Sequence, residues 1–264
     1  MMASFDLVAQ ALARYRNSSV DETVSPNDSM FDPGYKRVGI SAMNAILLAW
    51  QSSDVDEITR VLDIPCGHGR VLRHLVKLFP EAMFDACDLD QDGIAFCAKT
   101  FGARPLLSRE ALTTMQFDTT YDLIWVGSLF THVSRDIARA WLEHLAKFLS
   151  PKGVLVGTTH GRWSEHVYQH YPYISPEGWN TVMEGYRKSG YGYCDYQAKE
   201  NHAYIEGTYG ISMARPHVTI GDIEQIPDTR LLHYSERGWA DHQDVFAIGK
   251  PALTESWPWW ANPQ

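Results

Sequence analysis

The sequence lacks the cysteine spacing that marks disulfide-rich proteins and zinc sites. It has four cysteines in 264 residues, and none of them forms a C-x-x-C pair. Zinc sites need Cys and His ligands at closer spacing than this chain offers. We therefore expect buried, reduced thiols at Cys66, Cys87, Cys97 and Cys194.

Basic residues are also scarce. The chain has 23 Lys and Arg against 32 Asp and Glu, a net charge of −9, and no dense basic block. Binding to duplex nucleic acid depends on Lys and Arg that neutralise phosphates. We therefore expect no nucleic-acid partner.

Long apolar runs are absent. The longest, around residues 43–50, is much shorter than the roughly 20 residues that a membrane span needs. The N-terminus carries Asp6 and has no basic start ahead of an apolar run, so it does not resemble a signal peptide. These features predict a cytoplasmic protein without a membrane span.

What the sequence does have is an alternation of short apolar strands and amphipathic helices. Strand and helix alternation predicts a doubly wound α/β fold, in which helices cover both faces of a parallel sheet. The run DLIWVG, for example, is typical of a strand that is buried on both faces. The expected strands are 60–64, 83–89, 104–108, 121–127, 154–159, 229–235 and 243–250. The expected helices are 3–16, 37–52, 69–79, 92–101, 134–149 (with Ser134 as its cap) and 217–226.

The pattern divides the chain into five parts. We expect an N-terminal helical cap at 1–55, a cofactor-binding core at 56–160, an inserted substrate lid at 161–215, a closing helix and two strands at 216–250, and a Trp- and Pro-rich tail at 251–264. The insert holds nine of the 13 tyrosines. Tyrosine offers a flat apolar face with a polar tip, which suits a sugar ring or an aromatic acceptor.

A glycine-bearing loop, Asp63-Ile64-Pro65-Cys66-Gly67-His68-Gly69, follows the first strand of the core. Gly67 and Gly69 would let the backbone approach a ligand closely, and the helix that follows would attract an anionic group. Asp88 ends the next strand, where a carboxylate can accept hydrogen bonds from both hydroxyls of a ribose. These features fit either a dinucleotide or S-adenosylmethionine (SAM).

Details of the loop favour SAM. A dinucleotide site usually has a third glycine where this chain has Leu72. Asp63, at the strand end, can orient the loop or meet an ammonium group. Pro65 does not add to this preference, because it has no amide N–H and therefore cannot donate a hydrogen bond to the ligand.

Several segments resemble the motifs of class I SAM-dependent methyltransferases. VLDIPCGHGR and FDACDLD resemble motif I and the acidic second-strand motif, while YDLIWVGSLFTHV and LAKFLSPKGVLVGTTHG resemble the motifs around the fourth and fifth strands. The resemblance covers about residues 56–160, with a weaker match at 217–250. It implies a Rossmann-like, mostly parallel seven-stranded sheet with an antiparallel last strand, SAM as the cofactor and S-adenosylhomocysteine (SAH) as the product.

The resemblance also implies which residues bind the cofactor. The loop and the second strand implicate Asp63, Pro65, Cys66, Gly67, Gly69, Asp88 and Leu89, and the end of the fourth strand implicates Gly127, Ser128 and His132. The family usually has glycine at the position of Pro65, so contacts there depart from the pattern. Tyr35 and Gly39 are expected to close the pocket from the N-terminal side. Which of residues 108–110 meets the adenine stays open.

Methylation of a hydroxyl is helped by a general base, and histidine suits that role near neutral pH. The candidate bases are His132, His160 and His242, and the candidate acceptor contacts in the lid are His202, Tyr204 and Tyr209. No acid follows Gly127 closely, so we expect no metal.

The favoured function is methyl transfer from SAM to a hydroxyl of a small molecule or glycan. The segment GWADHQDVFAIGKP resembles bacterial methyltransferases found with surface-glycan biosynthesis. The alternatives are N-methylation of a small metabolite, a SAM- or SAH-binding module without catalysis, and an NAD-dependent oxidoreductase. Trp257, Trp259 and Trp260 in the tail fit either a homodimer contact or a strap on the protein's own surface.

Overall fold

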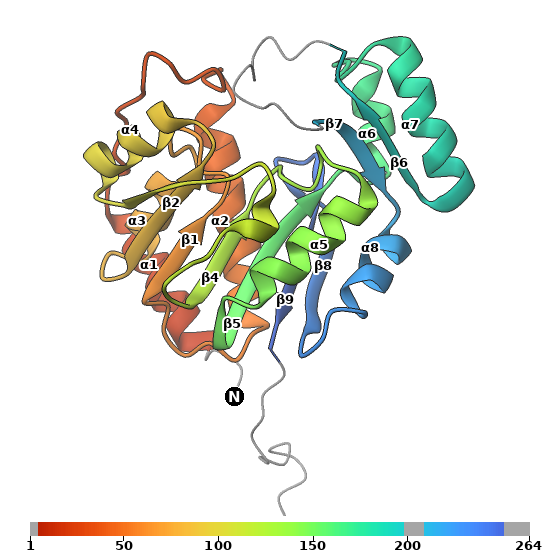
Figure 1. Cartoon of the computed structure of the whole chain (residues 1–264). Helices are drawn as coiled ribbons and strands as arrows, with labels where there is room; N and C mark the ends of the chain where they lie inside the picture. The colour runs from red at the N-terminus through yellow and green to blue at the C-terminus, as the bar shows by residue number, and fades with distance from the viewer. Residues whose placement is uncertain (1–4, 198–208, 251–264) are drawn as a thin grey trace, which may run out of the picture.

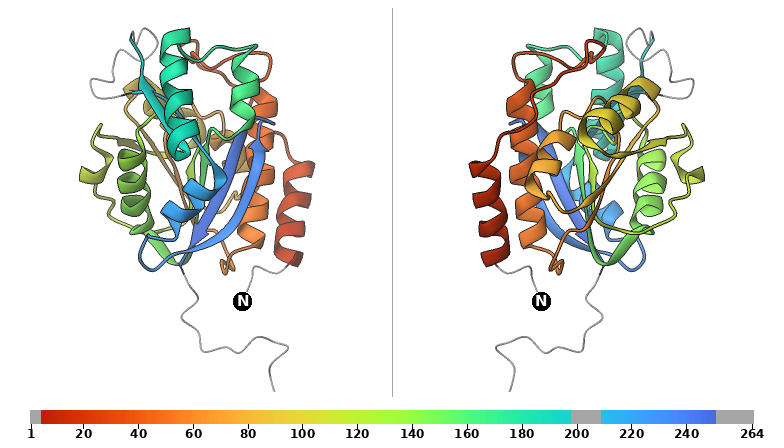
Figure 2. Two further views of the ribbon diagram at one scale, coloured as in Figure 1. Left: turned by 90° about the vertical axis from the view of Figure 1, so that its right-hand side faces the viewer. Right: turned by 90° about the vertical axis from the view of Figure 1, so that its left-hand side faces the viewer.

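A seven-stranded sheet lies between two layers of helices (Figures 1 and 2). The structure is a computed structural model that describes residues 5–197 and 209–250. In spatial order the strands are β3 (Arg104–Leu107), β2 (Met83–Asp88), β1 (Arg60–Asp63), β4 (Tyr121–Val126), β5 (Leu149–Thr159), β9 (Gln243–Gly249) and β8 (Arg230–Trp239).

The strand directions confirm the predicted fold class. β1 to β5 pair in parallel with their neighbours, whereas β9 pairs antiparallel with both β5 and β8. The sheet is therefore mostly parallel, and the last strand in the sequence is its antiparallel member. Because the parallel strands end at the same edge, the loops that follow β1, β2 and β4 meet there.

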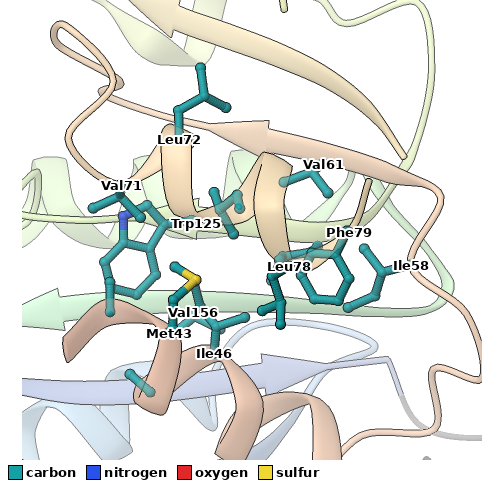
Figure 3. Close-up of a cluster of buried hydrophobic side chains, with 14 of the residues drawn as sticks. Met43, Ile46, Ile58, Val61, Val71, Leu72, Leu78, Phe79, Trp125 and Val156 are labelled. Carbon is teal, nitrogen blue, oxygen red and sulfur yellow. The ribbon is translucent and has the colours of Figure 1, made fainter. Parts of the chain in front are cut away.

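The central strands are buried because helices cover both of their faces. In β4, Leu123 and Trp125 belong to one hydrophobic core, and Ile124 and Val126 belong to the other, as the two-residue period of a strand requires. Figure 3 shows Trp125 packed among the side chains of the first core.

Different helices cover the two faces of the sheet. One face of the sheet packs against α1 (Phe5–Asn17), α2 (Tyr35–Gln51), α3 (Leu72–Leu78) and α4 (Gln91–Phe101). The other face packs against the short 3-10 helix η1 (Leu112–Thr114), α5 (Arg135–Ala146) and α8 (Pro216–Ile223). No helix in the described parts of the chain is long and apolar enough to cross a bilayer.

Three local predictions need correction. α3 begins at Leu72 rather than at residue 69, because the preceding loop turns through positive φ at Gly67 and Gly69. Ser134 occupies the N-cap position of α5 but makes no side-chain capping hydrogen bond. β5 begins at Leu149 rather than at residue 154. The turn expected between residues 149 and 154 is instead an irregularity within the strand, where the register to β4 shifts.

The insert after β5 forms a small unit at the carboxyl edge of the sheet (Figure 1). It contains α6 (Trp163–Tyr168), α7 (Pro176–Ser189) and a hairpin of β6 (Tyr191–Asp195) and β7 (Gly210–Ala214). Its own core comprises Trp179, Val182, Met183, Tyr186, Ile211 and Met213. The sequence did not predict this hairpin.

Strand β7 fastens the insert to the main sheet. The backbone amides of Gly210 and Ser212 donate to the carbonyls of His132 and Thr131, and the amide of Ala214 donates to the carbonyl of His160. The loop after β4 and the end of β5 are thereby tied to the same strand of the insert.

Candidate cofactor and acceptor site

A cavity of about 700 Å³ lies where the parallel strands end. This is the position at which open α/β sheets bind ligands. Of the residues predicted from the sequence, those that line it are Asp63, Pro65, Cys66, Gly67, Asp88, Leu89, Gly127 and Tyr209. The cavity therefore brings together the motifs that follow β1, β2 and β4.

Asp63 is the most unusual residue of the wall. Its side chain is 1% exposed, and neither carboxylate oxygen has a hydrogen-bond partner in the described residues. Burial raises the pKa of Asp63 well above its ordinary value and the nearby charge of Asp88 raises it further. The Leu72 amide opposes the shift, although it makes no hydrogen bond of ordinary geometry with the carboxylate. A buried carboxylate without a partner is unfavourable, so the site fits a ligand that brings a cation, such as the ammonium of SAM.

Asp88 supports the loop as well as facing the cavity. Its Oδ2 accepts a 2.7 Å hydrogen bond from the Gly67 amide, and its Oδ1 accepts one of 3.0 Å from the Asp90 amide. Burial raises the pKa of the Asp88 carboxyl, while these amides act against the increase. Each carboxylate oxygen can accept more than one hydrogen bond, so the ribose hydroxyls of SAM still fit here.

The two loop glycines have different roles. Gly67 has φ +49°, lines the cavity, and would place a Cβ in open space. Gly69 has φ +77° and lies outside the lining, and a Cβ there would come 2.5 Å from Phe101 and 3.2 Å from the Cys97 Sγ. Gly69 is therefore required for the packing of α4, and its contact with the cofactor stays a prediction.

The backbone amides of both glycines already donate hydrogen bonds within the protein. Gly67 donates to Asp88, and Gly69 donates to the Cys66 carbonyl at 2.9 Å. The expectation that these amides hold the ligand therefore needs correction: the loop offers the ligand space and an adjoining carboxylate.

Three of the four thiols are buried as expected, and Cys194 is not. Cys66, Cys87 and Cys97 are buried free cysteines, and Cys194 is half-buried. Cys66 lines the cavity, and its Sγ donates to the Gly67 carbonyl at 3.4 Å. A hydrogen bond with Cys97, together with burial, raises the pKa of Cys66, so it contributes to the site as a small apolar wall.

Two tryptophans that the sequence analysis did not select form another wall. Trp125 and Trp239 both line the cavity and meet edge to face, with ring centroids 5.3 Å apart. Trp239 is held by a 3.0 Å hydrogen bond from its Nε1 to the Val38 carbonyl. A Cβ on Gly127 would come 2.8 Å from Trp125 Nε1, so glycine is needed beside this ring.

Ser128 does not line the cavity but connects neighbouring strands through hydrogen bonds. It has φ +59°, its amide donates to Thr158 Oγ1 at 2.8 Å, and its Oγ accepts a 2.8 Å hydrogen bond from Gln243. These bonds join the end of β4 to β5 and β9. The contact of Ser128 with the cofactor therefore stays a prediction.

Tyr35 and Gly39 also lie outside the lining. Tyr35 donates a 2.7 Å hydrogen bond to Oδ2 of Asp28, and Asp28 lines the cavity together with Ser29 and Met30. A Cβ on Gly39 would overlap the His74 ring, so Gly39 serves the packing of α2 against α3. The N-terminal wall is therefore formed by residues 28–30, within the stretch before α2.

The remaining lining comes from the loop after β3 and from α5. It comprises Ser108, Arg109, Glu110, Ala111, Leu112 and Thr113, then Leu129, Asp136, Ile137, Ala140 and Trp141, with His68, Asp90 and Arg70 beside the glycine loop. Apolar side chains from Leu112, Ile137 and Trp141 give this end a surface that suits a flat ring. The sequence left open which of residues 108–110 contacts the adenine, and all three line the cavity.

The three candidate histidines cluster outside the lining. His132 stacks on Tyr209 with ring centroids 4.6 Å apart, and its Nδ1 lies 2.8 Å from the Gly210 carbonyl. His160 and His242 stack on each other at 5.2 Å, and His132 lies 6.4 Å from His160. The structure thus brings the three together outside the lining, and His132 stacks on Tyr209, which does line the cavity.

His160 and His242 are in apolar surroundings. Burial lowers the pKa of both, and the neighbouring histidines lower that of His160 further. His160 Nδ1 donates to the Ser212 carbonyl at 3.2 Å, and the His242 Nε2 lies 2.5 Å from the Tyr173 hydroxyl.

The other sequence candidates lie outside what the structure describes. His202 and Tyr204 fall in 198–208, and the tail tryptophans fall in 251–264. Within the described ranges, no three His, Cys, Asp or Glu side chains are arranged to hold a metal ion.

Residues 62–155 match the family model of a methyltransferase domain. The chain is 27% identical over 111 residues to a malonyl-[acyl-carrier protein] O-methyltransferase from Ilyobacter polytropus. The match covers 41% of this chain and 42% of the relative, so the chain spans less than half of that relative's length.

Solved structures share the fold at low sequence identity. An O-methyltransferase family protein from Burkholderia thailandensis superposes with a TM-score of 0.53 at 14% identity, over 85% of this chain and 57% of that one. The 1,6-didemethyltoxoflavin-N1-methyltransferase from the same organism, solved with SAH, gives 0.54 at 14% identity, over 92% and 87%. Residues 62–155 thus carry a methyltransferase domain, and the described chain has the strand order and the strand-end cavity of the SAM-dependent methyltransferase fold.

Proposed function

We propose that the chain transfers the methyl group of SAM to a hydroxyl of a small molecule or glycan, with a histidine as the general base. The observation that carries the proposal is the unpartnered, buried carboxylate of Asp63 in the same cavity wall as Asp88. When bound, SAM supplies a methyl group activated by the positive charge on its sulfur.

Different residues of the wall would contact different parts of the cofactor. Asp63 would accept the ammonium of the methionine part, and Asp88 would accept the ribose hydroxyls. Leu89 and Leu112 would flank the adenine. The open space at Gly67 would admit the chain that joins the ribose to the methionine part.

His132 is the favoured base. Its Nδ1 lies against the Gly210 carbonyl and must carry the proton there, which leaves Nε2 as the basic nitrogen. His160 is buried with a depressed pKa, and His242 is engaged with Tyr173, so both are weaker candidates. His132 is stacked on Tyr209, and only Tyr209 lines the cavity, so the proposal requires the His132 ring to gain contact with the acceptor when the acceptor binds.

One observation favours an amine acceptor as the second candidate. Six acids line the cavity, namely Asp28, Asp63, Asp88, Asp90, Glu110 and Asp136, against the two arginines Arg70 and Arg109. Such a wall attracts cations. A neutral amine also needs less help from a base, so N-methylation predicts a small effect of replacing His132.

The test combines binding with kinetics. Titration calorimetry with SAH and with NAD decides between a methyltransferase and an oxidoreductase. Methyl transfer from radiolabelled SAM to a panel of sugar nucleotides, phenols and amines then identifies the acceptor class.

Replacement of the candidate base then tests the mechanism. We expect His132→Ala to lower kcat by roughly 10²-fold or more, as for loss of a general base, with SAH affinity unchanged. His170→Ala, at an exposed position in the insert, is the matched control. Binding of SAH without turnover on any acceptor would instead indicate a binding module.

A further inference from the structure

The turn between β8 and β9 adopts a backbone conformation that alanine disfavours. Ala240 and Asp241 both have a φ of +55°, in the left-handed region. The His242 amide donates to the Trp239 carbonyl at 3.0 Å, which closes a β-turn over these residues. Such turns favour Gly, Asn and Asp, because the Cβ of other residues comes too close to the following carbonyl oxygen. A strained turn persists only where its surroundings hold it, and strain of this kind gathers at functional sites.

Helix α2 holds one side of this turn. The Ala240 amide donates to Ser41 Oγ at 2.7 Å, and the Trp239 Nε1 donates to the Val38 carbonyl at 3.0 Å. The Trp239 side chain is 3% exposed and lines the cavity, where it packs edge to face against Trp125. The turn thereby fixes the position of one aromatic wall of the cavity.

The insert holds the other side of the turn. The Tyr173 hydroxyl lies 2.5 Å from His242 Nε2, and the two rings are nearly parallel, with centroids 5.7 Å apart. Arg237 donates to Asp241 Oδ1 at 2.6 Å, and its guanidinium carbon lies 3.9 Å from the ring centroid of Trp163. Helix α6 and the loop that follows it therefore contact the residues that shape this turn.

Trp239 belongs to a part of the cavity wall that the proposed cofactor contacts do not use. In the proposed function, the parts of SAM contact the segments after β1, β2 and β3. Trp239 and Tyr209 enter the cavity from β8 and from the insert, and Met30 enters it from the stretch before α2. All three side chains are aromatic or apolar, so this part of the wall suits the apolar body of a methyl acceptor.

We propose that Trp239 contacts the methyl acceptor and that Tyr173 and His242 position it. The inference rests on the proposed function and gives His242 a positioning role in place of the role of general base. Because the His242 amide closes the turn onto the Trp239 carbonyl, a displacement of the His242 ring displaces Trp239 as well. The docking of the insert on the turn thus sets the shape of the acceptor end of the cavity.

The first measurement follows Trp239 itself and needs no acceptor. The protein is labelled with 5-fluorotryptophan, and the fluorine NMR resonance of Trp239 is identified by its loss in Trp239→Phe. We expect Tyr173→Phe and His242→Ala to shift that resonance. Tyr171→Phe makes the matched change at an exposed position of the same loop and should leave it in place. His242→Gln keeps a hydrogen-bonding group beside the Tyr173 hydroxyl and should shift it less than His242→Ala.

The second measurement uses whichever member of the panel of sugar nucleotides, phenols and amines turns over fastest. We expect Trp239→Phe, Tyr173→Phe and His242→Ala each to raise the KM of that acceptor by roughly tenfold, with kcat and SAH affinity within about twofold of the wild type. His242→Gln should stay near the wild type in both constants, although glutamine cannot accept a proton as a base does. If Trp239→Phe fails to fold, the KM values of Tyr173→Phe and the two His242 variants still decide.

The outcomes separate this inference from the proposed function. A wild-type protein that methylates no member of the panel contradicts the proposed function itself. Where the wild type turns over, an unmoved Trp239 resonance in Tyr173→Phe overturns the positioning role. So does a fall in kcat at unchanged KM in both His242 variants, which would make His242 the base. A loss of SAH affinity in Trp239→Phe as large as the rise in acceptor KM would place Trp239 against the cofactor and overturn its contact with the acceptor.

Discussion

The Gly67 amide donates a 2.7 Å hydrogen bond to Oδ2 of Asp88, so one carboxylate both shapes the glycine loop and faces the cavity. The charge and the hydrogen-bonding ability of Asp88 can be separated by mutation. An asparagine keeps an oxygen that can accept from the Gly67 amide, whereas an alanine leaves that amide without its partner.

We expect Asp88→Ala to lower the free energy of unfolding by about 1–3 kcal/mol, the cost of an unsatisfied buried donor. Asp88→Asn should lose much less stability. Both variants should bind SAH more weakly, because the ribose hydroxyls lose a charged acceptor. Urea unfolding and titration calorimetry measure the two effects. Equal stability of the two variants would show that the hydrogen bond does not support the loop.

The two loop glycines give a second matched pair. Gly67→Ala should cost about 1 kcal/mol of stability, because only the positive φ is unfavourable and the added Cβ meets open space. Gly69→Ala should cost about 1–3 kcal/mol more, because its Cβ also collides with Phe101. The SAH affinity should fall in Gly67→Ala, whose Cβ enters the space that the ligand needs. A larger stability loss in Gly67→Ala than in Gly69→Ala would refute this division of roles.

The predicted site residues that line the cavity are those whose place follows from local order along one strand and its loop. Asp63, Gly67, Asp88 and Leu89 line the cavity because each ends a strand of the parallel sheet or follows one directly. The sheet topology was predictable for the same reason, since the alternation of strands and helices leaves few arrangements.

The residues that the sequence did not predict depend on packing between distant segments. Trp239 enters the wall from the end of β8 and is anchored to Val38 in α2. Ser128 bonds to Gln243, 115 positions away, instead of reaching the cavity.

Because Asp63 is buried without a hydrogen-bond partner in the described residues, we expect its neutralisation by mutation to stabilise the free protein. Because burial raises its folded-state pKa above the unfolded value of about 3.9, the folded state binds more protons above that pH. The stability contributed by Asp63 is therefore present below about pH 3.9 and is lost as the pH rises through the folded pKa. Asp63→Asn should raise the melting temperature of the free protein at pH 7 by roughly 2–4 °C, which is about 1 kcal/mol for a domain of this size.

The gain from Asp63→Asn should shrink as the pH falls towards 4, where the wild-type carboxyl is also neutral. SAH should stabilise this variant less than the wild type, since the ammonium no longer meets a charge. Asp6→Asn, at an exposed position of α1, is the matched control and should change neither quantity. If Asp63→Asn is less stable than the wild type at pH 7, the Leu72 amide stabilises the carboxylate more than burial destabilises it.

His74 predicts how the protein responds to acid. Its ring is 3% exposed, its Nδ1 meets the Tyr15 hydroxyl at 2.6 Å, and its Nε2 has no partner in the described residues. Burial, with the charges of Arg73 and Lys77, lowers the pKa of His74 to about 4. The unfolded chain, with a His pKa of about 6.5, therefore binds more protons between pH 4 and 6.5.

Stability should consequently be lost as the pH falls through that window, with His74 contributing about 2 kcal/mol of the loss between pH 7 and pH 5. His74→Gln removes this titration, so its unfolding free energy should depend on pH less steeply by that amount. His170→Gln, at an exposed position, keeps the wild-type dependence. Urea unfolding at pH 5, 6 and 7 measures all three proteins. An unchanged pH dependence in His74→Gln would mean that His74 is already charged in the folded protein, which its buried, unpaired Nε2 makes unfavourable.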